Sequence, residues 1–137
     1  MDRRHLLAAA LFVPAVATAG SADAASSGPK ERKKGGGPNF LQLPTLTASV
    51  VRLDGRRGVL TVEAGVDAPD AAGFERAEAL RPRLRDAYNA ALFRFAAALR
   101  PGFAPDADQL ARDLQTATDR VYGKRGLKLL LGSIVVN

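Results

Sequence analysis

Residues 60–66 read Leu-Thr-Val-Glu-Ala-Gly-Val, and this stretch decides the fold class. Apolar residues alternate with polar or small ones, which is the pattern of a β-strand with one buried face and one face toward solvent. A similar apolar run covers residues 46–53, and the turn at residues 54–58 between the two contains two glycines. The sequence therefore predicts an antiparallel hairpin, which needs a further layer of structure to be stable.

Two helical segments are expected after the hairpin. The first runs from about residue 74 to residue 80, and Pro82 suits the first turn of the second helix better than an interior position. In the second helix, apolar side chains recur at helical spacing and define one buried face, at Leu84, Ala87, Tyr88, Ala91, Leu92, Phe95, Ala98 and Leu99. The Arg-Pro-Gly break at residues 100–102 ends it. Because Tyr88 belongs to this stripe, we interpret it as a packing residue with its hydroxyl at the rim of the core.

A third helix is expected after Pro105, with Asp106 as its N-cap and Gln109 completing a pattern like a capping box. Gly123 ends this helix, and its apolar stripe consists of Ala107, Leu110, Leu114, Ala117 and Val121. The last segment, residues 127–136, is apolar enough for a strand covered on both faces. The predicted class is α+β, in which the hairpin and the C-terminal strand form one sheet and two to three helices pack on it.

The first 24 residues have the features of an export signal. Arg3 and Arg4 precede an Ala- and Leu-rich run at residues 6–22, and small residues suited to signal cleavage follow. Adjacent arginines followed by apolar residues favour the twin-arginine export route. We therefore expect a periplasmic protein whose signal is removed. The alternative is an inner-membrane anchor formed by residues 6–22, although this run is short for a span and is interrupted by Pro14.

Residues 25–38 are expected to form a basic, Gly- and Pro-rich linker that leads to a folded domain at residues 39–137. The linker holds four basic residues and one acidic residue, so its net charge of +3 is half of the chain's formal +6. A basic run can bind nucleic acid or acidic lipid, but this one has no interleaved aromatic residues for stacking on bases. We interpret it as a solvated spacer. No nucleic-acid partner is expected, and membrane contact is at most peripheral.

The residue inventory argues against catalysis. The chain contains no Cys and a single His, His5, which belongs to the expected export signal. Disulfides and thiol chemistry are therefore excluded, and removal of the signal also removes the commonest general base. No spacing typical of a metal site, a phosphate-binding loop or a paired-carboxylate centre is present. We expect no enzyme, no catalytic residues, no metal and no cofactor.

One candidate contact patch lies on the longest expected helix. At 100° per residue, Phe93 points nearly opposite the apolar stripe, and its neighbours there are Asn89, Ala90 and Ala97. A bulky aromatic among small side chains on a wet face is a candidate surface for a protein partner or for self-association. The alternative is that Phe93 packs against the N-terminal extension or against the loop at Phe103.

A cationic cluster, Arg81, Arg83 and Arg85, lies at the start of the same helix. Cations oppose the helix dipole at this end, so helix stability does not explain the cluster. A phosphate or carboxylate ligand is one explanation. The other, which we favour, is intramolecular pairing with the carboxylates nearby in sequence, at Glu75, Glu78 and Asp86.

Four segments in this order carry a resemblance to a known family: Arg-Arg-Gly-Val-Leu-Thr-Val-Glu-Ala at 56–64, Arg-Pro-Arg-Leu-Arg-Asp-Ala at 81–87, the capped helix at 107–114, and Leu-Leu-Leu-Gly-Ser-Ile-Val-Val-Asn at 129–137. Together they resemble the periplasmic domain of the flagellar basal-body-associated protein FliL family. The positions that match the family's helix start and terminal strand are Pro82, Leu84, Arg85, Asp86 and Ile134 to Asn137. The resemblance covers residues 39–137.

The resemblance implies a stomatin-like domain that assembles around the motor stators in the periplasm and adjusts torque or stability without chemistry of its own. The expected partners are then flagellar motor components. The chain departs from the family at its N-terminus, where an export signal stands in place of the transmembrane anchor. An alternative function is that of a small periplasmic binder, which would hold an anionic ligand through Arg81, Arg83 and Arg85.

Overall fold

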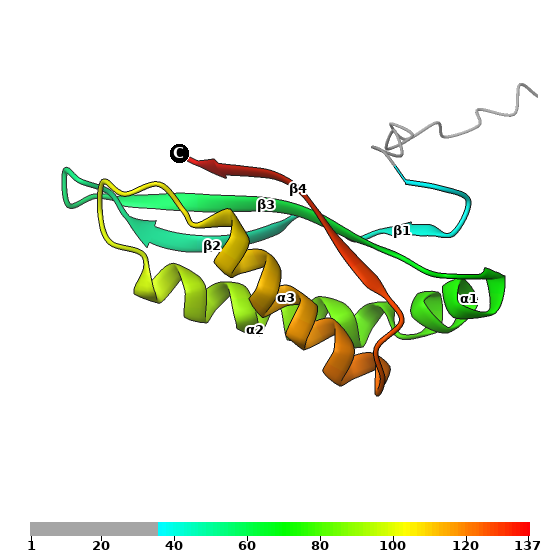
Figure 1. The fold of residues 1–137 in the computed structure, drawn as a ribbon. Coiled ribbons are helices and arrows are strands. Elements are labelled where there is room, and N and C mark those ends of the chain that lie inside the picture. Colours follow the sequence, from blue (N-terminus) through cyan, green and yellow to red (C-terminus); the bar gives the residue numbers. More distant parts are fainter. Residues whose placement is uncertain (1–35) are drawn as a thin grey trace, which may run out of the picture. The chain divides into compact units, whose positions relative to one another are not determined.

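The computed structural model describes residues 36–137, all of which belong to the second of two compact units, Arg32–Asn137. In chain order the elements are β1 (Phe40–Gln42), β2 (Leu46–Val51), β3 (Arg57–Asp67), α1 (Ala71–Ala79), α2 (Arg81–Ala98), α3 (Ala107–Tyr122) and β4 (Lys128–Val136). The described residues thus form one antiparallel sheet of four strands together with three helices (Figure 1). This arrangement confirms the predicted α+β class.

The central strand of the sheet is β3, the longest of the four. Both β1 and β2 pair with one side of it, in succession along its length, while β4 pairs with its other side. The apolar residues that predicted this strand all face the core and are buried: Leu60, Val62, Ala64 and Val66. The hairpin partner β2 buries Leu46, Ala48 and Val50 in the same alternating way.

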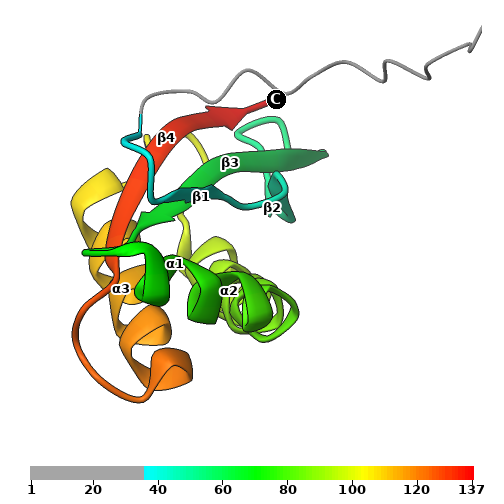
Figure 2. The same cartoon turned by 90° about the vertical axis from the view of Figure 1, so that its right-hand side faces the viewer.

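The helices cover one face of the sheet and leave the other face uncovered by any element of the described chain (Figure 2). Contacts place α2 against β2, α3 against β4, and the two helices against each other. The predicted burial of the last strand on both faces is therefore wrong. Val135 and Val136 are 42% and 43% exposed, because β4 lies at the edge of a sheet that has only one helical layer.

A β-bulge divides β4 into two halves. Val62 pairs with Ile134 and Ala64 pairs with Leu131, so two residues of β4, Gly132 and Ser133, stand opposite the single residue Glu63. The bulge shifts the side-chain alternation by one position. Leu129 and Leu131 before it and Ile134 and Val136 after it consequently share the face toward the helices.

The helix boundaries follow their capping residues. The first helix begins at Ala71, three residues before the predicted start, because the Asp70 carboxylate accepts a hydrogen bond from the Gly73 N–H at 2.6 Å. Asp106 caps α3 in the same way through the Gln109 N–H at 3.0 Å, and Gly123 ends α3 with a positive φ of 82°. Both ends of α3 agree with the prediction.

The predicted apolar stripes are correct at their centres and wrong at their ends. Ala98 and Ala107 are exposed; Ala98 is the last residue of α2 and Ala107 is the first residue of α3. The core takes Ala96, Thr118 and Tyr122 in their place.

Candidate interaction surfaces

The outer face of α2 carries the predicted contact patch. Phe93 is 57% exposed, Ala90 and Ala97 are exposed, and Asn89 is partly exposed. The Phe103 side chain is 63% exposed as well, so neither aromatic ring is buried by the other. The other alternative, packing on the N-terminal extension, concerns residues that lie mostly outside the described range. Within the described residues, the four side chains form an uncovered patch, which we call the Phe93 patch.

The Phe93 patch is held in place by the opposite face of α2. That face packs on the sheet and on α3, and its buried residues are Leu84, Tyr88, Ala91, Leu92 and Ala96. Because the buried residues fix the rotation of the helix about its axis, they also fix the direction in which Phe93 points. The patch is therefore a preformed feature of a packed helix and does not belong to a loop.

A buried hydrogen bond links α2 to α3 behind the patch. The Thr118 hydroxyl donates to the Leu114 carbonyl oxygen at 2.8 Å and lies 2.5 Å from the Tyr88 hydroxyl oxygen. Because a threonine hydroxyl has a single proton, Tyr88 is the donor in the second bond. Burial raises the pKa of Tyr88 to about 12, so its phenol is neutral at physiological pH.

The prediction that the Tyr88 hydroxyl lies at the rim of the core is wrong. Both Tyr88 and Thr118 are fully buried, because the threonine supplies an acceptor inside the core and the phenol has no need of water. The pair links α2 to α3, and no other titratable side chain among residues 36–137 donates a hydrogen bond to it or accepts one from it.

The predicted anion cluster at the start of α2 does not converge on one point. Arg81 donates to Glu78 at 2.7 Å, which is the predicted intramolecular pairing. Arg83 and Arg85 are exposed, and no ion pair to either is found within the described part of the chain. Since Arg83 follows Arg81 by two residues, it lies about 200° around the helix from it. The three guanidinium groups therefore do not form a common pocket.

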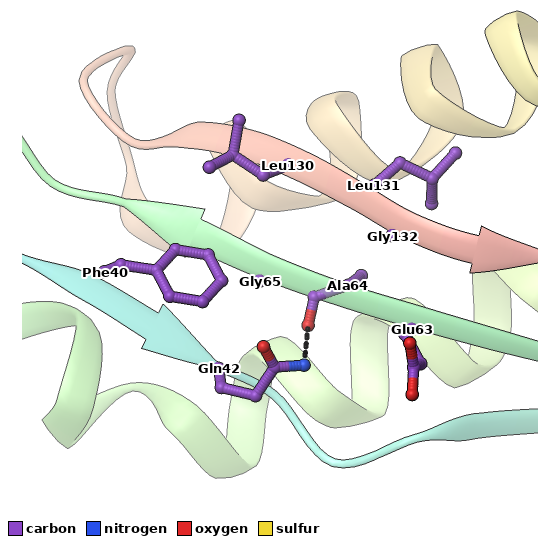
Figure 3. Close-up of a pocket in the computed structure, with 8 residues that line it drawn as sticks. All are labelled: Phe40, Gln42, Glu63, Ala64, Gly65, Leu130, Leu131 and Gly132. Atoms are coloured by element: carbon purple, nitrogen blue, oxygen red, sulfur yellow. Dashed lines mark hydrogen bonds between the residues drawn. The ribbon is translucent and has the colours of Figure 1, made fainter. Parts of the chain in front are cut away.

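A small hollow on the uncovered face of the sheet was not predicted. Its volume is about 90 Å³, and it is lined by residues of β1, β3 and β4 (Figure 3). The Phe40 ring lies directly against Gly65, where a Cβ atom would approach the ring Cζ to 2.3 Å. The Gln42 side-chain amide donates to the Ala64 carbonyl oxygen at 3.4 Å. A hollow of this size is far below the few hundred Å³ that small-molecule sites occupy.

A second unpredicted feature is an open groove between the end of α2 and the start of α3. Its walls include the side chains of Phe95, Leu99 and Phe103, and its rim carries both acidic and basic residues. The Arg100 guanidinium stacks over the Phe103 ring at 4.7 Å from its centroid. The sequence offered one signal for this groove, an aromatic residue at 103 inside a Pro- and Gly-rich break.

Among residues 36–137, no three acidic or histidine side chains gather in a way that could hold a metal ion. No helix in this range combines the length and the apolarity that a membrane crossing requires. The expected export arginines, Arg3 and Arg4, lie outside the described residues. A scan of protein-family models and a search of curated proteins each return no match for this chain.

Proposed function

We propose that this chain is an exported, FliL-like protein without catalytic activity, which acts through protein–protein contacts at the cell envelope, near the flagellar basal body. The observation that carries the proposal is the Phe93 patch. It combines an exposed aromatic ring with small neighbours on a rigid helix, as protein-binding hot spots do. The large ring loses little conformational freedom on binding because it has only two rotatable bonds.

Two further observations support the location and the absence of chemistry. The pattern of the first 24 residues is typical of a periplasmic export signal. The domain has no His and no Cys, and its most deeply buried titratable group, Tyr88, is occupied in a structural hydrogen bond. The resemblance to the FliL periplasmic domain adds the flagellar motor as the expected partner.

The proposal is tested by Phe93→Asp, with Phe103→Asp as the matched control. Both residues are exposed phenylalanines, so both changes should leave the unfolding midpoint in urea close to that of the wild type. Phe93→Asp should lower capture of envelope proteins in pull-down experiments at least about tenfold, the typical loss at a hot spot, and should reduce swimming. Equal capture by both variants would remove the Phe93 patch from the function. Normal swimming of a deletion strain would remove the flagellar motor.

The second candidate function, binding of an anionic ligand, has less support from the geometry. Arg81 is paired with Glu78, and Arg83 lies on a different side of α2. Charge-led binding would weaken steeply with ionic strength, whereas contact through the Phe93 patch would not. A salt titration of the captured partner therefore separates the two functions.

A further inference from the structure

The outer edge of β4 has backbone groups that no strand of residues 36–137 pairs. Within the described chain, β3 pairs with one side of β4 and no strand pairs with the other. Val59 and Asn137 exchange both of their backbone hydrogen bonds, at 3.0 and 3.1 Å. In an antiparallel pair of strands, hydrogen-bonded residue pairs of this kind alternate with pairs that are not hydrogen-bonded to each other. The N–H and C=O groups of the latter pairs point away from the neighbouring strand. The peptide groups of Ile134 and Val136 therefore point outward, away from β3.

Half of this edge is already covered by α3. The Gln115 side-chain oxygen accepts from the Leu129 N–H at 2.8 Å, and the Gln115 side-chain amide donates to the Leu127 carbonyl oxygen at 2.9 Å. Beyond the β-bulge, no described side chain bonds the outward peptide groups in this way. A further strand can therefore be added only along residues 133–137.

The free half lacks the usual protection of an edge strand. Residues 129–137 contain no charged side chain and no proline, although both are common where proteins must prevent strands from pairing edge to edge. The chemistry of the β4 edge thus fits another uncharged, extended strand.

We propose that this edge binds the same edge of a second copy of the chain, with the two β4 strands antiparallel about a twofold axis at Val135. In this register Ile134 of each copy lies opposite Val136 of the other. Each of these two pairs exchanges two hydrogen bonds, so every outward group of both residues finds a partner. The two Val135 side chains meet on the uncovered face of the joined sheet.

A second copy fits this edge for reasons of charge and shape. The folded domain is basic, with 14 basic and 11 acidic residues at 39–137, but pairing through residues 133–137 brings no charged side chains of the strands together. Helical periodicity places Asp108, Ala111 and Arg112 on the same side of α3 as Gln115. In the turns before Gln115 this flank carries one acid, one base and a small residue, and Asp119 beyond it accepts a hydrogen bond from the Gln115 side chain at 2.9 Å. The part of the flank before Gln115 therefore has no net charge, and two copies can approach there without net repulsion.

The dimer does not depend on the proposed function, because it uses β4 and leaves the Phe93 patch on α2 untouched. The test is the mass of the full chain in sedimentation velocity across a concentration series. The wild type should form a dimer, and Val136→Pro should raise the dimer dissociation constant at least about tenfold, since it removes two of the interchain hydrogen bonds. The lost N–H points away from β3, so the fold keeps its own ladder.

The matched control is Ser49→Pro, which removes an outward N–H from the opposite edge. Ser49 is opposite Val59, whose own peptide groups bond Asn137, so the Ser49 N–H also points away from β3. This variant should dimerise as the wild type does. A wild type that stays monomeric at several hundred micromolar would overturn the proposal, and so would a dimer lost in Ser49→Pro but kept in Val136→Pro.

A second pair of variants tests the register. Val135→Lys and Val135→Glu each place two like charges at the twofold axis, so each variant alone should dimerise at least about tenfold more weakly than the wild type. An equimolar mixture should form a heterodimer, because the charges then attract. Amide exchange at Ile134 and Val136 should also slow as the wild-type concentration rises. Failure of the mixture to associate, or exchange independent of concentration, would overturn the twofold arrangement.

Discussion

We predict that removing the Thr118 hydroxyl destabilises the fold more than removing the Tyr88 hydroxyl, although the two groups are hydrogen-bonded to each other in the core. In Thr118→Val, the Tyr88 hydroxyl keeps its place in the core and loses its acceptor. In Tyr88→Phe, the Thr118 hydroxyl still donates to the Leu114 carbonyl oxygen, so no polar group is left without a partner. A buried polar group that is left without a hydrogen-bond partner lowers the free energy of unfolding more than removal of that group does.

The magnitudes follow from this difference. Thr118→Val should lower the free energy of unfolding by about 1–3 kcal/mol, and Tyr88→Phe by about 0.5–1.5 kcal/mol. The double variant should resemble Tyr88→Phe, because it contains no orphaned hydroxyl. The sum of the two single losses should therefore exceed the loss in the double variant by about 1–3 kcal/mol, which is the coupling energy of the pair.

Urea unfolding, followed by circular dichroism, measures the free energy of unfolding of the wild type, of the two single variants and of the double variant. A cost of about 1 kcal/mol corresponds to a shift of roughly 4–8 °C in Tm for a domain of this size, so thermal melts provide an independent readout. Strict additivity of the two single changes would refute the reasoning. A larger loss in Tyr88→Phe than in Thr118→Val would do so as well, since it would mean that an orphaned Tyr88 hydroxyl destabilises the fold less than removal of that hydroxyl.

Two more predictions concern pH and backbone approach. Because the pKa of Tyr88 is raised from 10 to about 12, the stability that depends on its neutral phenol should be complete below pH 10 and be lost as the pH rises from 10 to 12. At pH 11, the free energy of unfolding of the wild type, measured in urea, should fall by about 1.4 kcal/mol more than that of Tyr88→Phe. Equal decreases in the two proteins would contradict this prediction. Gly65→Ala should lower the free energy of unfolding by about 1–3 kcal/mol, because the new Cβ would press on the Phe40 ring, whereas Gly37→Ala, with no neighbour within 4 Å, should be close to neutral in the same assay.

The elements that local chemistry determines could be predicted from the sequence. The alternation of apolar and polar residues predicts burial on one face, and β3 shows this alternation from Arg57 to Ala64, after which Gly65 and Val66 are both buried. Asp106 and Gly123 mark the ends of α3 because capping depends on the residue itself and on its immediate neighbours. Asp70 has the same role at α1, but the helix was predicted to begin at residue 74 because its first turn, Ala-Ala-Gly, has no apolar periodicity.

The last strand shows why burial could not be predicted from composition alone. Its apolar run was interpreted as a strand with two covered faces, but the bulge at Gly132 and Ser133 changes which positions face the helices. Leu129 and Leu131 fit one alternation, whereas Ile134 and Val136 fit the other. A run that satisfies both alternations in turn has no clear period, so a half-buried strand resembles a fully buried one.

Of the surfaces described above, the position of Phe93 could be predicted from the sequence, whereas the hollow and the groove could not. Phe93 could be placed because helix rotation follows from sequence spacing. The hollow beside Phe40 and the groove near Phe103 could not, since each joins elements whose relative positions arise only on folding. The environment of Tyr88 depends likewise on Thr118, which is 30 residues away along the chain and belongs to another helix.

The two proposed surfaces differ in physical kind, and this difference determines what each can contribute. The β4 edge would bind through backbone groups that every strand has, so its specificity must come from register and from the absence of charge. The Phe93 patch would bind through a side chain, so it can select a partner. Because α2 packs against β2 and α3 packs against β4, a dimer formed through β4 keeps one Phe93 patch on each copy. Val136→Pro should then weaken capture of a multivalent partner by the loss of avidity alone, whereas Phe93→Asp should weaken capture and leave the dimer intact.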